Sequence, residues 1–456
     1  MQVTASKKQI WTAGSYSLLT LSIMVGFMYL NAFATEVLKI PASTLATVLL
    51  IAKSIDFIVS MFGGVIIEKV KMGNKGKYQG WLNVGRWILF ICIAVEVFPT
   101  AGPVWLRCLI MAAGYTVLNS LMNLIQTAYY GIIGIVAGPN PANRSAMTVN
   151  MTRQGTVVTL ITSFIPTLVS KLQFGQWNYF IVALVFALPM PFALGAIAKM
   201  ADGKDQPIVK GGAAAGAPRI TIKDMIDCLI HNPMLLVLFL VNVILNIGNN
   251  ILSNQNVYYW LYVAGDFSKM TVNSLFMAFV AFFAAIIMPK LGAKLGKRGA
   301  MCFGYIWSAV SFFLRWYVAR FGWVWMMISN AVAAVGMYTY MPYAMLLWMD
   351  VGEWYLNKTG KDTRGICMGL ASPPMKIGMA VGGTIGLKLL ASSGYVAGFT
   401  PDAAWVTKFM NGAYLVPAIC VTISAVIFIL FYRISDADAA RYAQENAAKM
   451  AAQKQQ

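Results

Sequence analysis

The sequence predicts an all-α membrane protein with about a dozen transmembrane helices. Of its 456 residues, 59% are hydrophobic and only 11% are charged, whereas a soluble domain carries about 25% charged residues. A soluble core of this length would not hide so much apolar surface, so lipid is the expected solvent. Apolar runs of about 20 residues, long enough to cross about 30 Å of hydrocarbon, recur along the chain.

Twelve apolar runs follow one another, with polar loops between them. Backbone polar groups in lipid must be paired within their own segment, so each run is expected to form a helix rather than an open strand. The expected helices are 10–33, 41–66, 81–99, 104–136, 149–170, 177–198, 233–261, 270–289, 300–319, 321–347, 365–391 and 410–432.

The basic residues set the expected orientation. The net charge is +19, but lysines and arginines gather in alternate loops instead of along one face, so no nucleic-acid partner is expected. The loops after helices 2, 6, 8 and 10 are basic, as are both termini, while the opposite loops are poor in positive charge. The sequence therefore predicts a multi-pass protein of the plasma (inner) membrane, with both termini cytoplasmic.

The longest loop divides the chain into two halves of six helices. It contains the glycine- and alanine-rich run Gly211–Pro218, which is typical of a flexible linker. Basic glycine turns recur at matching places, Gly73–Lys77 and Gly296–Gly299, and this pattern favours the major facilitator fold with two pseudo-symmetric halves. The expected parts are an N-terminal six-helix bundle (1–198), a cytoplasmic linker (199–232), a C-terminal six-helix bundle (233–432) and a cytoplasmic tail (433–456) that is either a surface helix or disordered.

The most specific motifs lie between helices 10 and 11. In order, they are Pro342-Tyr343, Asp350–Trp354, Thr359–Lys361, Arg364-Gly365 and Lys376–Gly378. This order resembles the glycoside–pentoside–hexuronide cation symporter family, which includes melibiose and glucuronide permeases. The resemblance extends over nearly the whole chain and is close in the second half. It implies cation-coupled uptake of a glycoside, sugar or hexuronide by alternating access, with H⁺ or Na⁺ as the coupling ion and no other cofactor.

The first half departs from the melibiose-type permeases, which have two carboxylates one turn apart in helix 2. Here Asp56 matches the first carboxylate, and Ser60 stands at the second. Those permeases also hold galactosides with carboxylates in helices 1 and 4, where this chain has Thr20 and Gln126. The replacements weaken the case for sodium coupling and for galactosides.

Asp56 and Lys376 are the residues expected to couple transport to a cation. Charged groups inside a membrane span are costly and tend to face the protein interior. A single carboxylate with Ser60 is a thin ligand set for Na⁺, whereas a buried carboxylate readily binds a proton, which favours H⁺. The resemblance places Lys376 beside the cation site, where it would pair with Asp56. The alternatives are a static salt bridge or, for Asp56, a position near a helix end.

The substrate is expected to contact polar residues of helices 1, 4 and 5. Asn119, Asn123 and Gln126 share one helix face, with Tyr130 along the same side, and amides and rings suit sugar hydroxyls and C–H faces. Amide bonding between helices is the alternative. Arg153 looks like the family's helix 5 arginine and could hold a carboxylate; its alternative is snorkelling to the interface. The resemblance implies a cavity that has lost two carboxylates, at Thr20 and Gln126, but kept Arg153 and Lys376. Such a cavity is more positive, which favours an anionic substrate such as a glucuronide.

Asp350, Glu353 and Arg364 are expected in the cytoplasmic loop between helices 10 and 11, as gate salt bridges. An enzyme is not expected, because a single histidine leaves little support for a hydrolase triad or a His-based metal site. The lack of a Walker-type motif argues against ATP-driven pumping. The leading prediction is a symporter that works as a monomer in the bilayer on a small-molecule solute. The alternatives are a carrier of another organic anion or of a lysolipid on the same fold, and a membrane sensor that does not transport.

Overall fold

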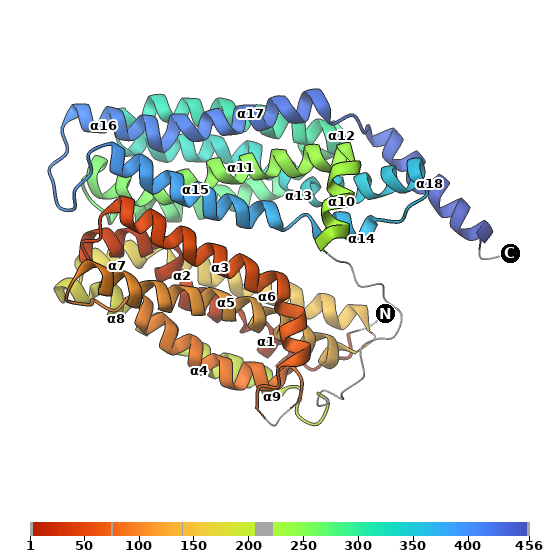
Figure 1. Ribbon diagram of the computed structural model, residues 1–456, viewed down its shortest axis with the longest axis horizontal. Coiled ribbons are helices and arrows are strands. Elements are labelled where there is room, and N and C mark those ends of the chain that lie inside the picture. Colours follow the sequence, from red (N-terminus) through yellow and green to blue (C-terminus); the bar gives the residue numbers. More distant parts are fainter. Residues whose placement is uncertain (1–2, 74–75, 139, 206–221, 454–456) are drawn as a thin grey trace. The chain divides into compact units, whose positions relative to one another are not determined.

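The computed structural model describes residues 3–73, 76–138, 140–205 and 222–453, and all regular structure within these ranges is helical (Figure 1). The glycine-rich run Gly211–Pro218 and part of the first basic turn lie outside the described residues. The chain forms two compact units. Unit 1 comprises residues 1–215, 265–275 and 395–399, and unit 2 comprises residues 216–264, 276–394 and 400–456.

Unit 1 is built from the helices of the first half of the chain. Asn140 begins one of them: its side chain accepts a hydrogen bond from Ala142 N at 3.0 Å, and Pro141 provides a φ suited to the first turn. The expected start at residue 149 is therefore wrong. The helices are α1 (Lys7–Gly14), α2 (Ser17–Ala32), the π-turn η1 (Phe33–Val37), α3 (Ala42–Lys69), α4 (Gln79–Glu96), α5 (Val104–Ala137), α6 (Pro141–Thr162), α7 (Ile165–Lys171), the 3₁₀ turn η2 (Gly175–Trp177), α8 (Asn178–Ala187) and α9 (Pro189–Lys199).

Most helices of the second half belong to unit 2, although the first residues of α12 belong to unit 1. Asn232 caps α11 by accepting from Leu235 N at 3.0 Å. The helices are α10 (Ile222–His231), α11 (Pro233–Tyr258), the π-turn η3 (Tyr259–Val263), α12 (Lys269–Val318), the 3₁₀ turn η4 (Ala319–Phe321), α13 (Trp323–Thr359), α14 (Arg364–Gly369), α15 (Pro373–Ser392), α16 (Ala403–Met410), the π-turn η5 (Asn411–Leu415), α17 (Val416–Phe431) and α18 (Asp436–Gln453).

The boundaries differ from the expected ones where polar sequence continues a helix. The segment 199–232 contains the helix α10, and the tail forms α18. Helix α13 runs on to Thr359 and ends at Gly360, whose φ of 73° suits a left-handed cap. Asp350 and Glu353 therefore lie on a helix, so their expected position in a loop is wrong.

Seven helices among the described residues are long and apolar enough to cross a membrane. One of them, Lys269–Phe321, contains two of the twelve expected helices, because α12 continues through the turn at Gly296, where φ is 73°. Others, such as α6 with 22 residues and α15 with 20, are long enough but contain more polar residues. Each of the twelve apolar runs nevertheless corresponds to helix in the structure.

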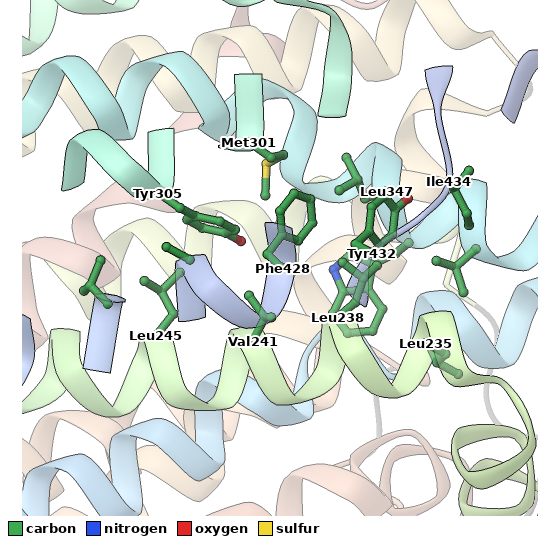
Figure 2. Packing of buried hydrophobic residues seen from close by; sticks show 14 of the residues in the cluster. Leu235, Leu238, Val241, Leu245, Met301, Tyr305, Leu347, Phe428, Tyr432 and Ile434 are labelled. Carbon is green, nitrogen blue, oxygen red and sulfur yellow. The ribbon is translucent and has the colours of Figure 1, made fainter. Parts of the chain in front are cut away.

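The core of unit 2 is packed with large apolar side chains. Helix α11 runs beside α15 and α17 (Figure 1). Figure 2 shows Leu238, Val241 and Leu245 on the side of α11 that faces Phe428 and Tyr305. The Phe428 ring packs edge-on against Tyr305 at 5.3 Å and stacks on Tyr432 at 4.9 Å. This packing gives the unit a firm scaffold.

The two basic glycine turns share one structural device. In unit 1, Asp205, which follows α9, accepts hydrogen bonds from Tyr78 N at 2.7 Å and Gln79 N at 2.8 Å, where α4 begins. In unit 2, Asp436, which follows α17, accepts from Lys297 N at 2.6 Å and Arg298 N at 3.2 Å.

The glycines in both turns leave room for these carboxylates. A Cβ on Gly76 would collide with Asp205, and a Cβ on Gly296 would collide with Asp436. Both glycines also have positive φ, 50° and 73°, which favours glycine over other residues. The repeat seen in the sequence is thus a repeat of geometry, in which an acid beyond the sixth helix of each half holds the turn that follows the second helix.

Candidate functional site

Asp56 and Asn123 form the centre of the candidate site in unit 1. Asp56 lies on α3 and Asn123 on α5, both half-buried, and Asn123 Nδ2 donates to Asp56 Oδ1 at 2.8 Å. The same amide also donates to Asn119 O at 2.8 Å, and Asn119 Nδ2 donates to Tyr115 O at 2.9 Å. The structure therefore joins the expected coupling carboxylate to an expected substrate residue across two helices.

Ser60 lies one turn beyond Asp56 on α3. Its hydroxyl donates to Phe57 O at 2.7 Å, so its proton is engaged within its own helix while its oxygen keeps a lone pair. This leaves Ser60 able to accept a hydrogen bond or to contribute an oxygen ligand.

The other expected substrate residues of unit 1 are exposed on its surface. Thr20 on α2 and Gln126 on α5 are both exposed. Tyr130 is 53% exposed, and its ring packs against Tyr129 at 5.3 Å. None of these three residues takes part in the hydrogen bond between Asp56 and Asn123.

Arg153 lies near the middle of α6. It follows the first residue, Pro141, by twelve residues, which is about 18 Å of helix, and its side chain is exposed. The sequence placed Arg153 at the start of its helix, so that position is wrong. Whether Arg153 binds substrate or snorkels to an interface stays a prediction.

Lys376 lies in unit 2, on the first turn of α15, and is half-buried. Small residues that follow it let α15 approach α11 closely. A Cβ on Gly382 would lie 2.5 Å from Ile247 O, and one on Gly378 would collide with Asn246. Asp56 belongs to unit 1, so the expected pairing of Lys376 with Asp56 stays a prediction.

The amide stripe of α11 bonds within its own helix. Asn246, Asn250 and Asn254 each donate to the carbonyl four residues earlier, at 2.7 to 2.9 Å. Asn242 does the same with Leu238 O at 2.8 Å.

The expected gate residues make ion pairs within unit 2. Asp350 pairs with Lys297, and Arg364 pairs with Glu353 at 3.1 Å and with Asp362 at 2.7 Å. Hydrogen bonds from Arg364 hold the pKa of Asp362 below its ordinary value. These pairs tie the end of α13 to the turns beside it. Their role as a gate stays a prediction.

Helix α18 is tied to the same cluster. Asn446, which is buried, donates to Glu353 O at 2.9 Å and to Glu353 Oε2 at 2.7 Å, and Asn357 donates to Glu445 Oε2 at 2.7 Å. From the sequence we expected no function for this tail, and in the structure it contacts Glu353, one of the predicted gate residues.

Three ionisable residues inside apolar helices were missed by the sequence reading. Lys53 stands one turn before Asp56 on α3, Glu96 ends α4 with 2% of its surface exposed, and Arg315 on α12 is 5% exposed. Their signal was present, because a charge within an apolar run is itself informative. Glu96 and Arg315 were passed over because each lies near the end of its run.

The comparisons with known proteins point to one class. A family model described as MFS/sugar transport protein matches residues 13–436. The isoprimeverose transporter of Lactiplantibacillus pentosus is 25% identical, over 95% of this chain and 92% of its own length. The glucuronide carrier protein homolog of Escherichia coli (strain K12) is 22% identical, over 90% of this chain and 89% of its own.

A solved structure shows the fold. A crystal structure of a mutant nucleoside transporter NupG superposes with a TM-score of 0.67 at 12% identity, covering 94% of this chain and 100% of that one. The similarity shows that the helices adopt the major facilitator fold that the sequence predicted.

Proposed function

The chain belongs to the MFS/sugar transport protein family, as its resemblance to the glycoside–pentoside–hexuronide symporters indicated. We propose that it carries an anionic sugar, such as a glucuronide or hexuronide, into the cell together with a proton. It is a transporter of the sugar type and a multi-pass membrane protein, not an enzyme. We also propose that the protein lies in the plasma membrane with both termini in the cytoplasm. It would work as a monomer and move its substrate by alternating access of the two halves.

The hydrogen bond between Asn123 and Asp56 carries the proposal of proton coupling. Asp56 is half-buried and accepts a hydrogen bond from the Asn123 amide, and a carboxylate in such a place can bind one proton. Na⁺ would need several oxygen ligands. In the proposed cycle, protonation of Asp56 frees Lys376 and shifts the equilibrium between conformations.

The charge of Arg153 supports the proposal of an anionic substrate. Its guanidinium is exposed near mid-helix, where it could bind a carboxylate with two parallel hydrogen bonds. The glucuronide carrier homolog is similar over most of both chains. Glucuronides carry the carboxylate that such an arginine would recognise.

Uptake into proteoliposomes tests the proposal. We expect an inward H⁺ gradient, and not a Na⁺ gradient, to drive accumulation of a glucuronide above equilibrium. Asp56→Asn should abolish accumulation while downhill exchange continues, and Asp227→Asn, an exposed aspartate on α10, is the matched control. If Asp56→Asn still accumulates the glucuronide, Asp56 does not couple transport to the proton. If only a Na⁺ gradient drives accumulation, the proposal of proton coupling is wrong.

Arg153→Gln tests the substrate class. Hydrogen bonds to a charged group contribute about 1.5–3 kcal/mol, so we expect about 10- to 100-fold weaker glucuronide binding with little change for a neutral glycoside. Arg144→Gln is the control, because Arg144 lies on the same helix and donates to Gly138 O at 3.1 Å. Equal losses for the neutral and the anionic sugar would contradict recognition of the anion.

A further inference from the structure

Glu96 occupies a niche formed by two glycines. It is the last residue of α4, and only 2% of its surface is exposed. A Cβ on Gly26 of α2 would collide with its carboxyl oxygens, and a Cβ on Gly114 of α5 would lie 2.6 Å from its backbone nitrogen. Gly26 therefore leaves room for the carboxyl on α2, and Gly114 lets α5 approach the backbone at the end of α4.

Nothing in the described part of the chain neutralises a charge on this carboxyl. The basic residues on the helices packed around α4 are engaged or distant. Arg86 donates to Pro191 O at 3.0 Å, Arg107 donates to Leu38 O at 2.7 Å, and Lys199 is the last residue of α9. No hydrogen bond or ion pair to the Glu96 carboxyl occurs among the described residues.

Its surroundings add negative rather than positive potential. Glu96 stands at the C-terminal end of α4, where unpaired carbonyls give a helix its partial negative charge. Apart from these basic residues, the titratable side chains nearby or on the neighbouring helices include Cys92 on α4, Tyr29 on α2, Tyr115 on α5, Tyr179 on α8 and, beyond Tyr115, Asp56 on α3, and none of these carries a positive charge. Burying an ionised carboxylate here would lack any compensating donor.

We propose that Glu96 is a second proton-binding site, which holds its proton while α2, α4 and α5 pack as they do here and releases it to water as H⁺ when that packing opens. Its proton binding does not depend on which solute is carried, whereas a part in coupling rests on the proposed function.

A polar line along α5 connects this site to the first. Asn123, which binds Asp56, lies eight residues or about 12 Å from Tyr115, and Asn119 lies between them. Tyr115 follows Gly114, the residue against which Glu96 packs. Movement of α5 against α4 would therefore change the surroundings of Glu96 and Asp56 together.

Infrared difference spectroscopy of the full chain in lipid nanodiscs tests the proposal without any transport assay. A pH step from neutral to alkaline should bleach the carbonyl stretching band of a protonated carboxyl in the wild-type protein. Labelling glutamate with ¹³C should shift that band, which narrows its source to five residues, Glu36, Glu68, Glu96, Glu353 and Glu445. Glu96→Gln should remove the shifted band, and Glu445→Gln, a change at an exposed carboxylate, should leave it.

Either of two results would overturn the inference. One is a wild-type spectrum with no glutamic acid band at neutral pH, which needs no variant and so does not depend on the folding of Glu96→Gln. The other is a glutamic acid band that persists unchanged in a folded Glu96→Gln protein. If the band behaves as expected but no H⁺ gradient drives uptake, the proposed function fails and Glu96 still binds a proton.

Discussion

At the scale of single residues, Asn123 is the group through which α5 acts on Asp56. Its amide donates across the helix boundary at 2.8 Å, and interhelical hydrogen bonds in membranes contribute about 0.6–2 kcal/mol. We expect Asn123→Ala to lower the stability of unit 1 by about 1 kcal/mol and to weaken proton-driven accumulation. Thermal melting in detergent and uptake in proteoliposomes measure the two effects.

Thr127→Val is the matched change for Asn123→Ala. Thr127 lies one turn further along α5 and donates only to Asn123 O, within its own helix, at 2.9 Å. It should leave both accumulation and melting close to those of the wild-type protein. Equal effects of the two variants would mean that the bond to Asp56 contributes nothing specific.

The sequence identified Asp56 and Asn123 separately but not their contact. Their helix faces could be read from residue spacing, whereas the rotation of α3 against α5 depends on packing that no local pattern encodes. Glu96 shows the opposite limit. In the sequence, a glutamate near the end of an apolar run resembles a residue at the membrane boundary. Only the structure shows that this glutamate is buried against Gly26 and Gly114.

At the scale of helices, Asp205 and Asp436 stabilise equivalent turns in the two halves. Each carboxylate accepts two backbone N–H groups at a basic glycine turn, and loss of a capping side chain costs about 0.5–2 kcal/mol. We expect Asp205→Ala and Asp436→Ala each to lower the melting temperature in detergent by a few degrees, about 2–4 °C per kcal/mol for units of roughly this size.

Asparagine at the same positions is the internal control for these two variants. Asp205→Asn and Asp436→Asn keep an acceptor oxygen but remove the charge, so they should lose less stability than the alanines. Gly76→Ala and Gly296→Ala should be at least as damaging as the alanine variants, because the new Cβ would meet the carboxylate. If all six variants melt like the wild-type protein, the turns do not depend on these acids.

Helix boundaries were predictable only where hydrophobicity ends with the helix. The apolar cores of the twelve helices were readable, since lipid requires them. Helix α13 continues through the polar residues Asp350 and Glu353, and α10 and α18 contain charged residues, so hydropathy could not find these parts. Their stability depends on side-chain contacts such as Asn446 with Glu353.

At the scale of the whole molecule, the internal repeat connects sequence, structure and mechanism. The two basic turns are the only part of the repeat that the sequence showed directly, and the structure adds the matching acids Asp205 and Asp436. An alternating-access carrier needs two halves of equivalent construction around a shared site. Equivalent turns at equivalent places fit such a construction. The choice of substrate, in contrast, depends on a few side chains and not on the repeat.

The same turns predict the orientation of the molecule in the membrane. Both basic turns and the residues before α10 are rich in lysine and arginine, while the loop between α4 and α5 contains none, and positively charged loops stay in the cytoplasm. We expect a fluorescent protein fused after Lys199 or after Gln456 to fluoresce. Alkaline phosphatase fused at Gly102 should be active, because that enzyme folds only outside the cytoplasm. Phosphatase activity at Lys199 together with fluorescence at Gly102 would show that the orientation is the reverse of the predicted one.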